Sequence, residues 1–336
     1  MTPAGWHVQE IPVTSRPQWM TLRGEDLCAS EAGAVFPDRP ELAHKYTTLR
    51  RVFMSKLYGE PAEQNMDMRR GKIMEPAVAE AIAVDCGWRP QRCGTYLRAR
   101  ADDPLVRMGA TLDYRLRVPT LDLLVHDKTR VTAAAAGWGE LSEMDLVVEC
   151  KSIDMGVWER EWSQGPPAYT VVQAADQALL AGADGALVAC LVENRSRDLH
   201  LYAVPRSEEF EGELIARVRE FWRGFDAGEE PPVVALDNAF MSDYFEHEKD
   251  ADAVIDLTEE AAVWQALVVE RESLKMSQKE IQRRIDMIEA TIKDRMRDAA
   301  RAILPGWSIT WKTDSRGVRS FKVERRAEKP NARKRR

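Results

Sequence analysis

The sequence has few cysteines, and they form no recognisable framework. Among its 336 residues the cysteines number five, an odd count, and no two of them stand as Cys-x-x-Cys. This argues against a disulfide scaffold, a four-cysteine zinc site and an iron–sulfur cluster, and it favours a reducing compartment. We therefore expect a cytoplasmic protein. The cysteines are Cys28, Cys86, Cys93, Cys150 and Cys190.

Long hydrophobic runs are also missing. No run of about 18 apolar residues occurs, so we expect no membrane span. The first residues lack a basic segment followed by an apolar one, so we expect no secretory signal. Apolar residues make up 44% of the chain and charged residues 31%. This composition predicts a soluble protein built as one large domain with an appendage.

Several common catalytic motifs are absent as well. The sequence has no Walker A motif, no GxGxxG and no GxSxG, which excludes the usual ATPase, dinucleotide-binding and serine-hydrolase classes. Its five histidines include no pair at metal-ligand spacing, which argues against zinc-hydrolase chemistry. These histidines are His7, His44, His126, His200 and His247.

Charge is distributed unevenly. The net charge is −7, but the last twelve residues sum to +6, which leaves −13 for the rest. Residues 226–260 alone hold twelve acids against one base. Such a body does not attract nucleic acid by bulk charge, so DNA contacts must come from local clusters and from the tail. The tail is either a solvated end or a non-specific phosphate tether. Its candidate contacts are Arg325, Arg326, Lys334, Arg335 and Arg336.

The order of hydrophobic patterns predicts an α/β fold. Residues 1–16 look irregular, and helical periodicity then gives way to short β-rich runs. The expected helices cover 17–36, 41–60, 66–86, 169–183 and 208–225. The expected strands cover 94–100, 106–118, 145–153, 186–195 and 199–205. Strands that surround a helix in this order indicate a mixed central sheet flanked by helices.

The rest of the chain is expected to be an appendage. We predict a core over 1–225 with an inserted loop at about 118–142, then an acidic linker over 226–257. Apolar residues at spacings of three, four and seven predict a long helical segment over 258–304, which packs as a helical hairpin or on the core, or oligomerises. A small β-hairpin over 305–324 and a disordered basic tail over 325–336 complete the expected organisation.

The strongest chemical signal is Glu149-Cys150-Lys151 on a predicted strand. Side chains alternate along a strand, so Glu149 and Lys151 share one face. Asp113 ends the preceding strand, which could bring it close to Glu149. Two converging carboxylates suit Mg²⁺ or Mn²⁺, and a nearby lysine can hold or polarise a water. A structural ion pair remains the alternative.

Three further groups could belong to the same site. Glu75 lies in a predicted helix and could add a third carboxylate, or be an ordinary acid near a helix start. Gln173, with Gln177 one turn later, could bind phosphate or water, or face solvent. Arg23 and Ser30 could form a phosphate site, although a serine there is also a common helix cap.

Together, in this order, these motifs resemble the YqaJ-type viral recombinase family, which includes the lambda-type exonucleases and has the PD-(D/E)XK nuclease fold. The resemblance covers roughly residues 17–205. It is carried by W-x-x-L-R…A-S-E, G-x-x-x-E-P, D…E-x-K and Y-x-x-x-Q. Leu112 replaces the family's usual proline before the aspartate, and the interval from Asp113 to Glu149 is longer than in the lambda-type enzymes. The resemblance implies a restriction-endonuclease-like core.

The resemblance also implies a role for each matching residue. Asp113 and Glu149 would hold two Mg²⁺ or Mn²⁺ ions, with Glu75 and the carbonyl of Cys150. Lys151 would position or activate the attacking water. The remaining matches are Gln173, which would support this network, and Arg23 and Ser30, which would bind the 5′-phosphate of a DNA end.

The implied activity is that of a metal-dependent deoxyribonuclease. Members of this family digest one strand of linear duplex DNA from 5′ to 3′ and pass the exposed strand to a single-strand annealing protein. They are phage or prophage proteins of the bacterial cytoplasm. Lambda-type members form trimers, but the region beyond about residue 226 has no counterpart there, so a homo-oligomer is left open. Two other functions also stay open: a structure-specific endonuclease of the same fold, and a non-catalytic DNA-end-binding or assembly protein.

Overall fold

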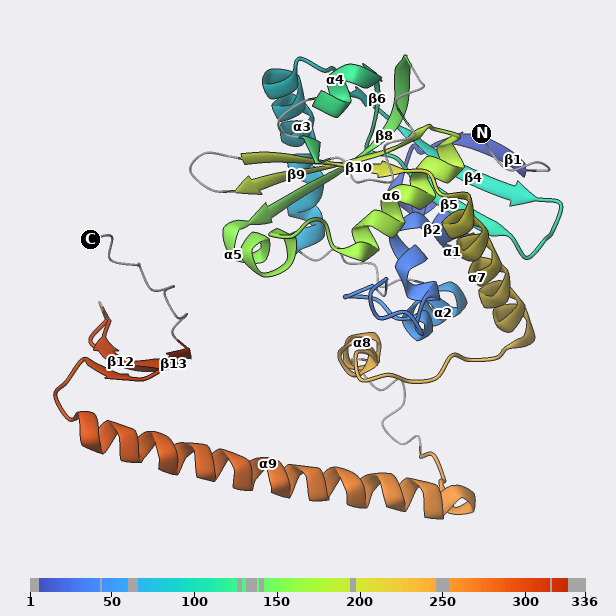
Figure 1. Cartoon of the computed structure of the whole chain (residues 1–336). Coiled ribbons are helices and arrows are strands. Elements are labelled where there is room, and N and C mark those ends of the chain that lie inside the picture. Colours follow the sequence, from blue (N-terminus) through green and yellow to red (C-terminus); the bar gives the residue numbers. More distant parts are fainter. Residues whose placement is uncertain are drawn as a thin grey trace, which may run out of the picture. The chain divides into compact units, whose positions relative to one another are not determined.

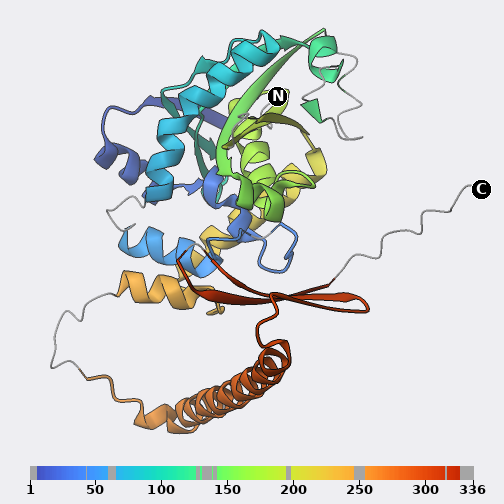
Figure 2. The ribbon, with the colours of Figure 1, turned by 90° about the vertical axis from the view of Figure 1, so that its left-hand side faces the viewer.

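The chain divides into two compact units, Met1–Glu248 and Lys249–Arg336. The computed structural model (Figures 1 and 2) describes most of each unit. The described residues are 6–42, 44–59, 66–125, 129–130, 138, 142–193, 198–245, 254–314 and 316–325. Among them, no helix combines the length and the apolar character needed to cross a membrane.

A six-stranded mixed sheet forms the centre of the first unit. Its middle strands β8 and β9 are parallel, and β6 and β10 flank them in antiparallel orientation. The strand order is β3 (Gln91–Arg92), β6 (Tyr114–Pro119), β8 (Glu143–Asp154), β9 (Gly185–Glu193), β10 (Asp198–Pro205) and β7 (Thr129–Arg130). The predicted strands 106–118 and 145–153, on either side of the inserted loop, are antiparallel neighbours in the part that forms β6.

Helices cover both faces of this sheet. Alternate residues of β9 belong to two separate apolar clusters, because side chains alternate across a strand. Val188 and Cys190 pack in the cluster that includes α6 (Ala168–Ala181), whereas Leu187 packs in the cluster that includes α3 (Met66–Cys86). Figures 1 and 2 show α3 and α6 on opposite faces. The predicted fold class, a mixed sheet flanked by helices, is confirmed.

A second sheet changes the prediction for residues 106–118. That run was expected as one strand, but it divides at Leu112-Asp113 into β5 and β6, which belong to different sheets. The second sheet has the order β1 (Trp6–Pro12), β4 (Thr95–Ala101), β5 (Arg107–Thr111) and β2 (Leu27–Cys28). The expectation that 1–16 is irregular is wrong for 6–12, because β1 pairs along β4. Asp113 consequently lies at the junction between the two sheets.

The expected helix over 17–36 is interrupted. It consists of α1 (Arg16–Glu25), strand β2 and the 3₁₀ helix η1 (Ala29–Val35). The break falls at Asp26, whose side chain is fully buried and accepts hydrogen bonds from the Tyr96 hydroxyl and the Arg98 Nε. These bonds to a neighbouring sheet stabilise a buried carboxylate that a continuous helix would leave without partners.

The predicted linker over 226–257 is also partly wrong. Helix α7 (Glu208–Ala227) is followed by a short helix, α8 (Asp237–Tyr244), and Phe240 packs in the core of the first unit. Asp237 is buried and accepts hydrogen bonds from the Val234 amide and from Thr48, the N-cap of α2 (Leu49–Tyr58). The hydrogen bond between Thr48 and Asp237 connects α2 with α8, and the acidic composition of 226–257 does not reveal this contact. Helix α2 is shorter than the predicted helix over 41–60.

The inserted loop holds some regular structure. Helix α4 (Thr120–Val125) and the short strand β7 lie within it, and β7 pairs in parallel with β10. Trp138 is buried in the same cluster as α3. The other residues of 118–142, apart from the end of β6 and Ser142, lie outside the described part of the chain. Two short helical segments, α5 (Met155–Val157) and η3 (Trp158–Trp162), follow β8.

The second unit begins with a single long helix. After the turn η4 (Thr258–Glu260), α9 runs from Ala261 to Met296 without a break, so the alternative of a helical hairpin is wrong. Arg297 then adopts a positive φ of 46°, which ends the helix before Pro305-Gly306. The residues that follow form a three-stranded sheet, larger than the predicted hairpin: β11 (Arg301–Leu304), β12 (Trp307–Thr313) and β13 (Arg319–Arg325).

Gly109, on β5 of the second sheet, lies where a larger side chain would not fit. A Cβ added to Gly109 would lie 1.9 Å from the Tyr96 hydroxyl, and the Tyr96 ring is fully buried. We expect Gly109→Ala to destabilise the protein by about 1–3 kcal/mol, the usual cost of overpacking. The matched control is Gly94→Ala, because nothing lies within 4 Å of its Cβ position. Urea unfolding checks both variants, and equal stabilities would contradict the prediction.

Candidate active site

The antiparallel pairing of β6 with β8 brings the predicted acids together. Tyr114 pairs with Val148, so Asp113, one residue earlier, lies opposite Glu149. The backbone amide of Cys150 donates a hydrogen bond of 2.9 Å to Asp113 Oδ2. The junction between the two sheets thus fixes the carboxylate of Asp113 against the central strand.

Glu149 is the centre of a hydrogen-bonded network. Its side chain is only 4% exposed, yet both carboxylate oxygens have partners. Lys151 Nζ lies 2.6 Å and Gln173 Nε2 lies 2.9 Å from Glu149 Oε1, and Gln177 Nε2 lies 2.7 Å from Oε2. Lys151 also donates to Gln173 Oε1 over 3.3 Å. These bonds offset the cost of burying the glutamate.

Local sequence explains this arrangement. Glu149 and Lys151 have the same parity on β8 as Val147, which packs in the cluster of α6. Gln173 and Gln177 stand four residues apart on α6, so one helix face presents both amides to the strand. The predicted shared face of Glu149 and Lys151 is therefore seen in the structure.

Repulsion between carboxylates marks the site. Burial raises the pKa of Asp113 well above its usual range, and the charges of Glu149 and Glu75 raise it further. Burial also raises the pKa of Glu75, on α3, although the charges of Lys72 and Arg92 oppose the rise. Both shifts mean that these buried carboxyl groups are costly to ionise where they stand.

The donor chemistry of this cluster fits a hard divalent cation. Carboxylate oxygens are the ligands that Mg²⁺ and Mn²⁺ prefer, and a cation would relieve the repulsion among Asp113, Glu149 and Glu75. Among the described residues, however, no three acidic, histidine or cysteine side chains already stand as a complete metal cage. Metal binding, the ligand role of Glu75 and that of the Cys150 carbonyl therefore stay predictions.

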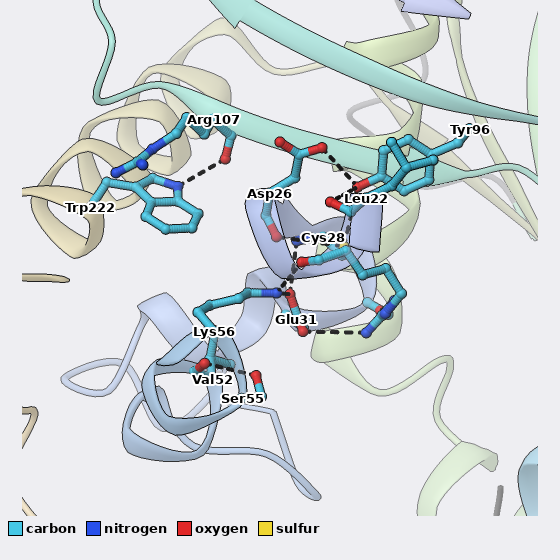
Figure 3. A network of polar contacts seen from close by, with 12 residues as sticks. Leu22, Asp26, Cys28, Glu31, Val52, Ser55, Lys56, Tyr96, Arg107 and Trp222 are labelled. Carbon is cyan, nitrogen blue, oxygen red and sulfur yellow. Dashed lines mark hydrogen bonds and ion pairs between the residues drawn. The ribbon is translucent and has the colours of Figure 1, made fainter. Parts of the chain in front are cut away.

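Arg23 and Ser30 are also brought together. Arg23 Nη1 donates to Ser30 Oγ over 3.1 Å, and its Nη2 donates to Glu31 Oε1 over 3.2 Å. Glu31 receives a second cation, because Lys56 Nζ lies 2.7 Å from its Oε2 (Figure 3). Two positive charges thus surround one negative charge, which leaves the group with the net positive charge that an anion such as phosphate requires.

Threonine 111 connects this basic group with the acidic cluster. Its backbone carbonyl accepts a hydrogen bond of 3.4 Å from Gln177 Nε2, and its hydroxyl accepts one of 2.9 Å from Trp19 Nε1. The Arg23 guanidinium lies over the Trp19 ring, 4.7 Å from its centroid. One residue of β5 therefore links the partners of Glu149 and of Arg23.

No protein-family model matches the sequence, and no curated protein matches it. Solved structures of exonucleases are similar to it in part. The chain is 14% identical to an alkaline exonuclease from Laribacter hongkongensis, at a TM-score of 0.42, covering 64% of this chain and 94% of that one. To the same enzyme in complex with dAMP the chain is 15% identical, at a TM-score of 0.43, covering 64% of this chain and 94% of that one. To a phage-related exonuclease from Haemophilus somnus 129PT it is 12% identical, at a TM-score of 0.39, covering 60% of this chain and 96% of that one.

The residues predicted for the tail fall mostly outside the described part of the chain. Arg326, Lys334, Arg335 and Arg336 lie beyond it. Arg325 ends β13, where its guanidinium lies 5.3 Å from the centroid of the Trp307 ring. The prediction that the disordered tail begins at Arg325 is therefore wrong for that residue.

Lys56 is a functional candidate that sequence reasoning missed. Its side chain is 2% exposed, and Nζ also donates to the Arg23 carbonyl over 2.7 Å. The signal was available, because Lys56 stands four residues after the buried Val52 on α2 and so shares its inward face. A lysine at a buried helical position requires an anionic partner.

His44 was noted only as an unpaired histidine, yet it packs against the helix that carries Gln173. Its ring is 4.7 Å from that of Tyr169, which starts the helix that carries Gln173. Burial, followed by the positive charges of Lys151 and Arg51, lowers the pKa of His44 to about 4. The imidazole is therefore neutral at physiological pH.

The Glu31 ion pairs predict a pH dependence of stability. Lys56 and Arg23 lower the pKa of Glu31 below its usual 4.5, although burial opposes them. Its contribution to the free energy of unfolding is therefore present above pH 4.5 and is lost as pH falls through the lowered value. We expect Glu31→Gln to cost about 3 kcal/mol at pH 7, since it leaves buried Lys56 unpaired.

Chemical unfolding of Glu31→Gln and the unaltered protein between pH 7 and pH 3 measures this effect. The difference between them should shrink as the pH falls below 4.5. Glu41→Gln is the control, because Glu41 is exposed, and it should change stability little at any pH. A constant difference across this range would contradict the assignment.

Proposed function

We propose that this protein is a Mg²⁺- or Mn²⁺-dependent deoxyribonuclease that digests linear duplex DNA from its ends, from 5′ to 3′. The observation that carries the proposal is the buried Glu149 carboxylate, held by Lys151 and two glutamines, with Asp113 opposite on the neighbouring strand. An acidic pair beside a lysine suits phosphodiester hydrolysis. In this role the protein would resect ends in the bacterial cytoplasm for a single-strand annealing partner.

The side chains divide the chemistry among them. Asp113 and Glu149, with Glu75, would hold the cation, which supplies Lewis-acid stabilisation of charge on the phosphate oxygens. Lys151 donates from Nζ to the attacking water or to a phosphate oxygen, and its ion pair with Glu149 keeps it cationic. Gln173 contacts both members of this pair and so fixes the distance between them.

The Arg23 group supports digestion from an end. An exonuclease must recognise a terminus, and the chemical feature of a 5′ terminus is its phosphate monoester. Arg23 and Lys56 place two cations around Glu31 in the same unit as the acidic cluster. We infer that this group binds the terminal phosphate while the scissile bond lies at Glu149 and Lys151.

Digestion of a duplex that carries a 5′-phosphate on one strand tests the proposal. We expect loss of the phosphorylated strand with Mg²⁺ and no loss with EDTA, while a closed circular duplex stays intact. Lys151→Ala should be inactive, and Lys279→Ala, an exposed lysine of α9, should be fully active. Cleavage of the circle would favour the endonuclease alternative. Binding of DNA without cleavage of either substrate would favour the non-catalytic one.

The role assigned to Arg23 predicts a change in end preference. In the unaltered protein, 5′-phosphorylated ends should be digested faster than 5′-hydroxyl ends. Arg23→Gln should lower the rate on phosphorylated ends about tenfold or more and leave the rate on hydroxyl ends nearly unchanged, since a charge-assisted phosphate contact is lost. Arg39→Gln, at an exposed ion pair, is the control. Equal rates on both ends in the unaltered protein would overturn the assignment.

A further inference from the structure

Helix α9 carries an apolar seam at heptad spacing. The helix is 36 residues long (Figure 1), and from Trp264 onward positions a and d of successive heptads alternate along it. The seam is interrupted by polar residues at three of these positions. Position a holds Trp264, Arg271, Gln278, Ile285 and Ile292, and position d holds Leu267, Leu274, Ile281, Ile288 and Arg295.

The described residues of the second unit do not cover this seam. Leu274 is 63% exposed and Ile281 is 61% exposed, and the only buried residue of α9 is Met296 at its C-terminal end. Most helical stability in proteins comes from packing of an apolar face. A seam of more than four heptads that stays in water lacks this source of stability, so it requires a partner.

We propose that α9 pairs with α9 of a second copy of this chain as a parallel, in-register, two-stranded coiled coil. The charges beside the seam favour this partner. In a parallel pair, each g position contacts the e position five residues later on the other helix. Glu270 then meets Lys275 of the second copy, and Arg284 meets Glu289. Both contacts join opposite charges, and each occurs twice.

The same charges are poorly used within one chain. Glu270 and Arg284 form no hydrogen bond or ion pair with any described residue. Lys275 has only a distant partner within its own helix, Glu272, at 3.9 Å. Val263 and Val268 occupy the first g and e positions, where they would extend the apolar contact between the two helices. Glu289 is the exception, because Lys293 Nζ lies 2.7 Å from its Oε2. A second copy therefore gives partners to Glu270 and Arg284 and a closer one to Lys275.

The polar residues of the seam set orientation and number. In a parallel pair Gln278 meets Gln278, and each amide can both donate and accept, whereas an antiparallel pair places Gln278 beside an aliphatic d residue. Arg271 packs beside Glu270 of the second copy and reaches solvent. The isoleucines alone would also allow three strands, but three Arg271 side chains would then converge on one axis. Arg271 therefore favours a coiled coil of two helices over one of three.

Sedimentation equilibrium of the full-length protein tests the number of chains. We expect the mass of two chains at micromolar concentration. Ile281→Asp should raise the dimer dissociation constant at least about 100-fold, because it buries a charge in each of two facing positions. Met276→Asp is the matched control, since Met276 is at the outward f position and is 68% exposed. A mass of one chain or of three chains in the unaltered protein would overturn the proposal.

Charge reversal tests the register. Glu270→Lys should weaken the dimer, and adding Lys275→Glu should restore it, because the pair between the copies is rebuilt with its signs exchanged. Disulfide trapping tests orientation. Gln278→Cys should give a covalent dimer on mild oxidation, whereas Ser273→Cys, at the outward c position, should not.

Equal trapping of both cysteine variants, or none of Gln278→Cys, would overturn the parallel arrangement. The unaltered protein, oxidised in parallel, controls for its own five cysteines. All of these readouts are masses, so they are independent of nuclease activity. A failure of the dimer leaves the proposed function untouched, and the reverse also holds.

Discussion

Replacing Lys151 with alanine is expected to lower the rate of DNA cleavage about 10³-fold, because one charged donor that acts only in the transition state is lost. The reason is geometric. Nζ lies 2.6 Å from Glu149 and 3.3 Å from Gln173, so it is fixed at the acidic cluster. DNA binding should change little, since a single charge among many phosphate contacts is removed.

Single-turnover cleavage and equilibrium binding measure the two effects separately. Lys151→Arg should be nearly as inactive as Lys151→Ala, because the larger guanidinium does not fit between Glu149 and Gln173 at these distances. Lys279→Ala serves as the control, as in the digestion test. Retention of a tenth or more of the unaltered rate by Lys151→Ala would exclude the assigned role.

Gln173 and Gln177 position the charged groups of the site, so we expect their loss to cost less activity than the loss of Lys151. Gln173 contacts Lys151 and Glu149, whereas Gln177 contacts Glu149 and the Thr111 carbonyl. Loss of such supporting contacts typically costs about 10–100-fold, less than loss of the charged donor itself. The amide network explains why Glu149 remains buried beside Asp113 without disrupting the fold.

The central strands could be predicted from the sequence because their signals are local. Short β-rich runs bounded by turn residues located β8 to β10, and the shared face of Glu149 and Lys151 followed from strand geometry. The helix α3 was predicted with its observed bounds. Asp113 was also predicted, because it lies on the β-rich run that precedes the strand of Glu149.

The errors arise where distant residues decide the structure. Leu112-Asp113 reads as part of one strand, but separate partners in two sheets divide it. Asp26 reads as a helical residue, and its partners Tyr96 and Arg98 lie 70 or more positions away. The partnership of Lys56 with Glu31 likewise depends on how α2 packs on η1. No local pattern contains this information.

Asp113→Asn should change stability and activity in opposite directions. Burial raises the pKa of Asp113 well above 3.8, and Glu149 and Glu75 raise it further, so at neutral pH its charge opposes folding when no cation is bound. The amide is neutral, and its oxygen can still accept the hydrogen bond from the Cys150 amide. Without divalent cations, the variant should therefore melt at a higher temperature than the unaltered protein.

The same substitution should abolish cleavage, because one of the proposed metal ligands is lost. In the unaltered protein Mg²⁺ should raise the melting temperature, since a ligand that binds only the folded state stabilises it. In Asp113→Asn this rise should disappear. Thermal melts with EDTA and with Mg²⁺, beside a cleavage assay, separate the two effects. Asp145→Asn, at a partly exposed ion pair with Arg115 on the same strand pair, is the control and should keep both activity and the response to Mg²⁺. A destabilised Asp113→Asn, in a protein whose melting temperature Mg²⁺ does not raise, would mean that the cluster is a structural ion-pair network. A destabilised Asp113→Asn that still responds to Mg²⁺ would exclude Asp113 as a metal ligand.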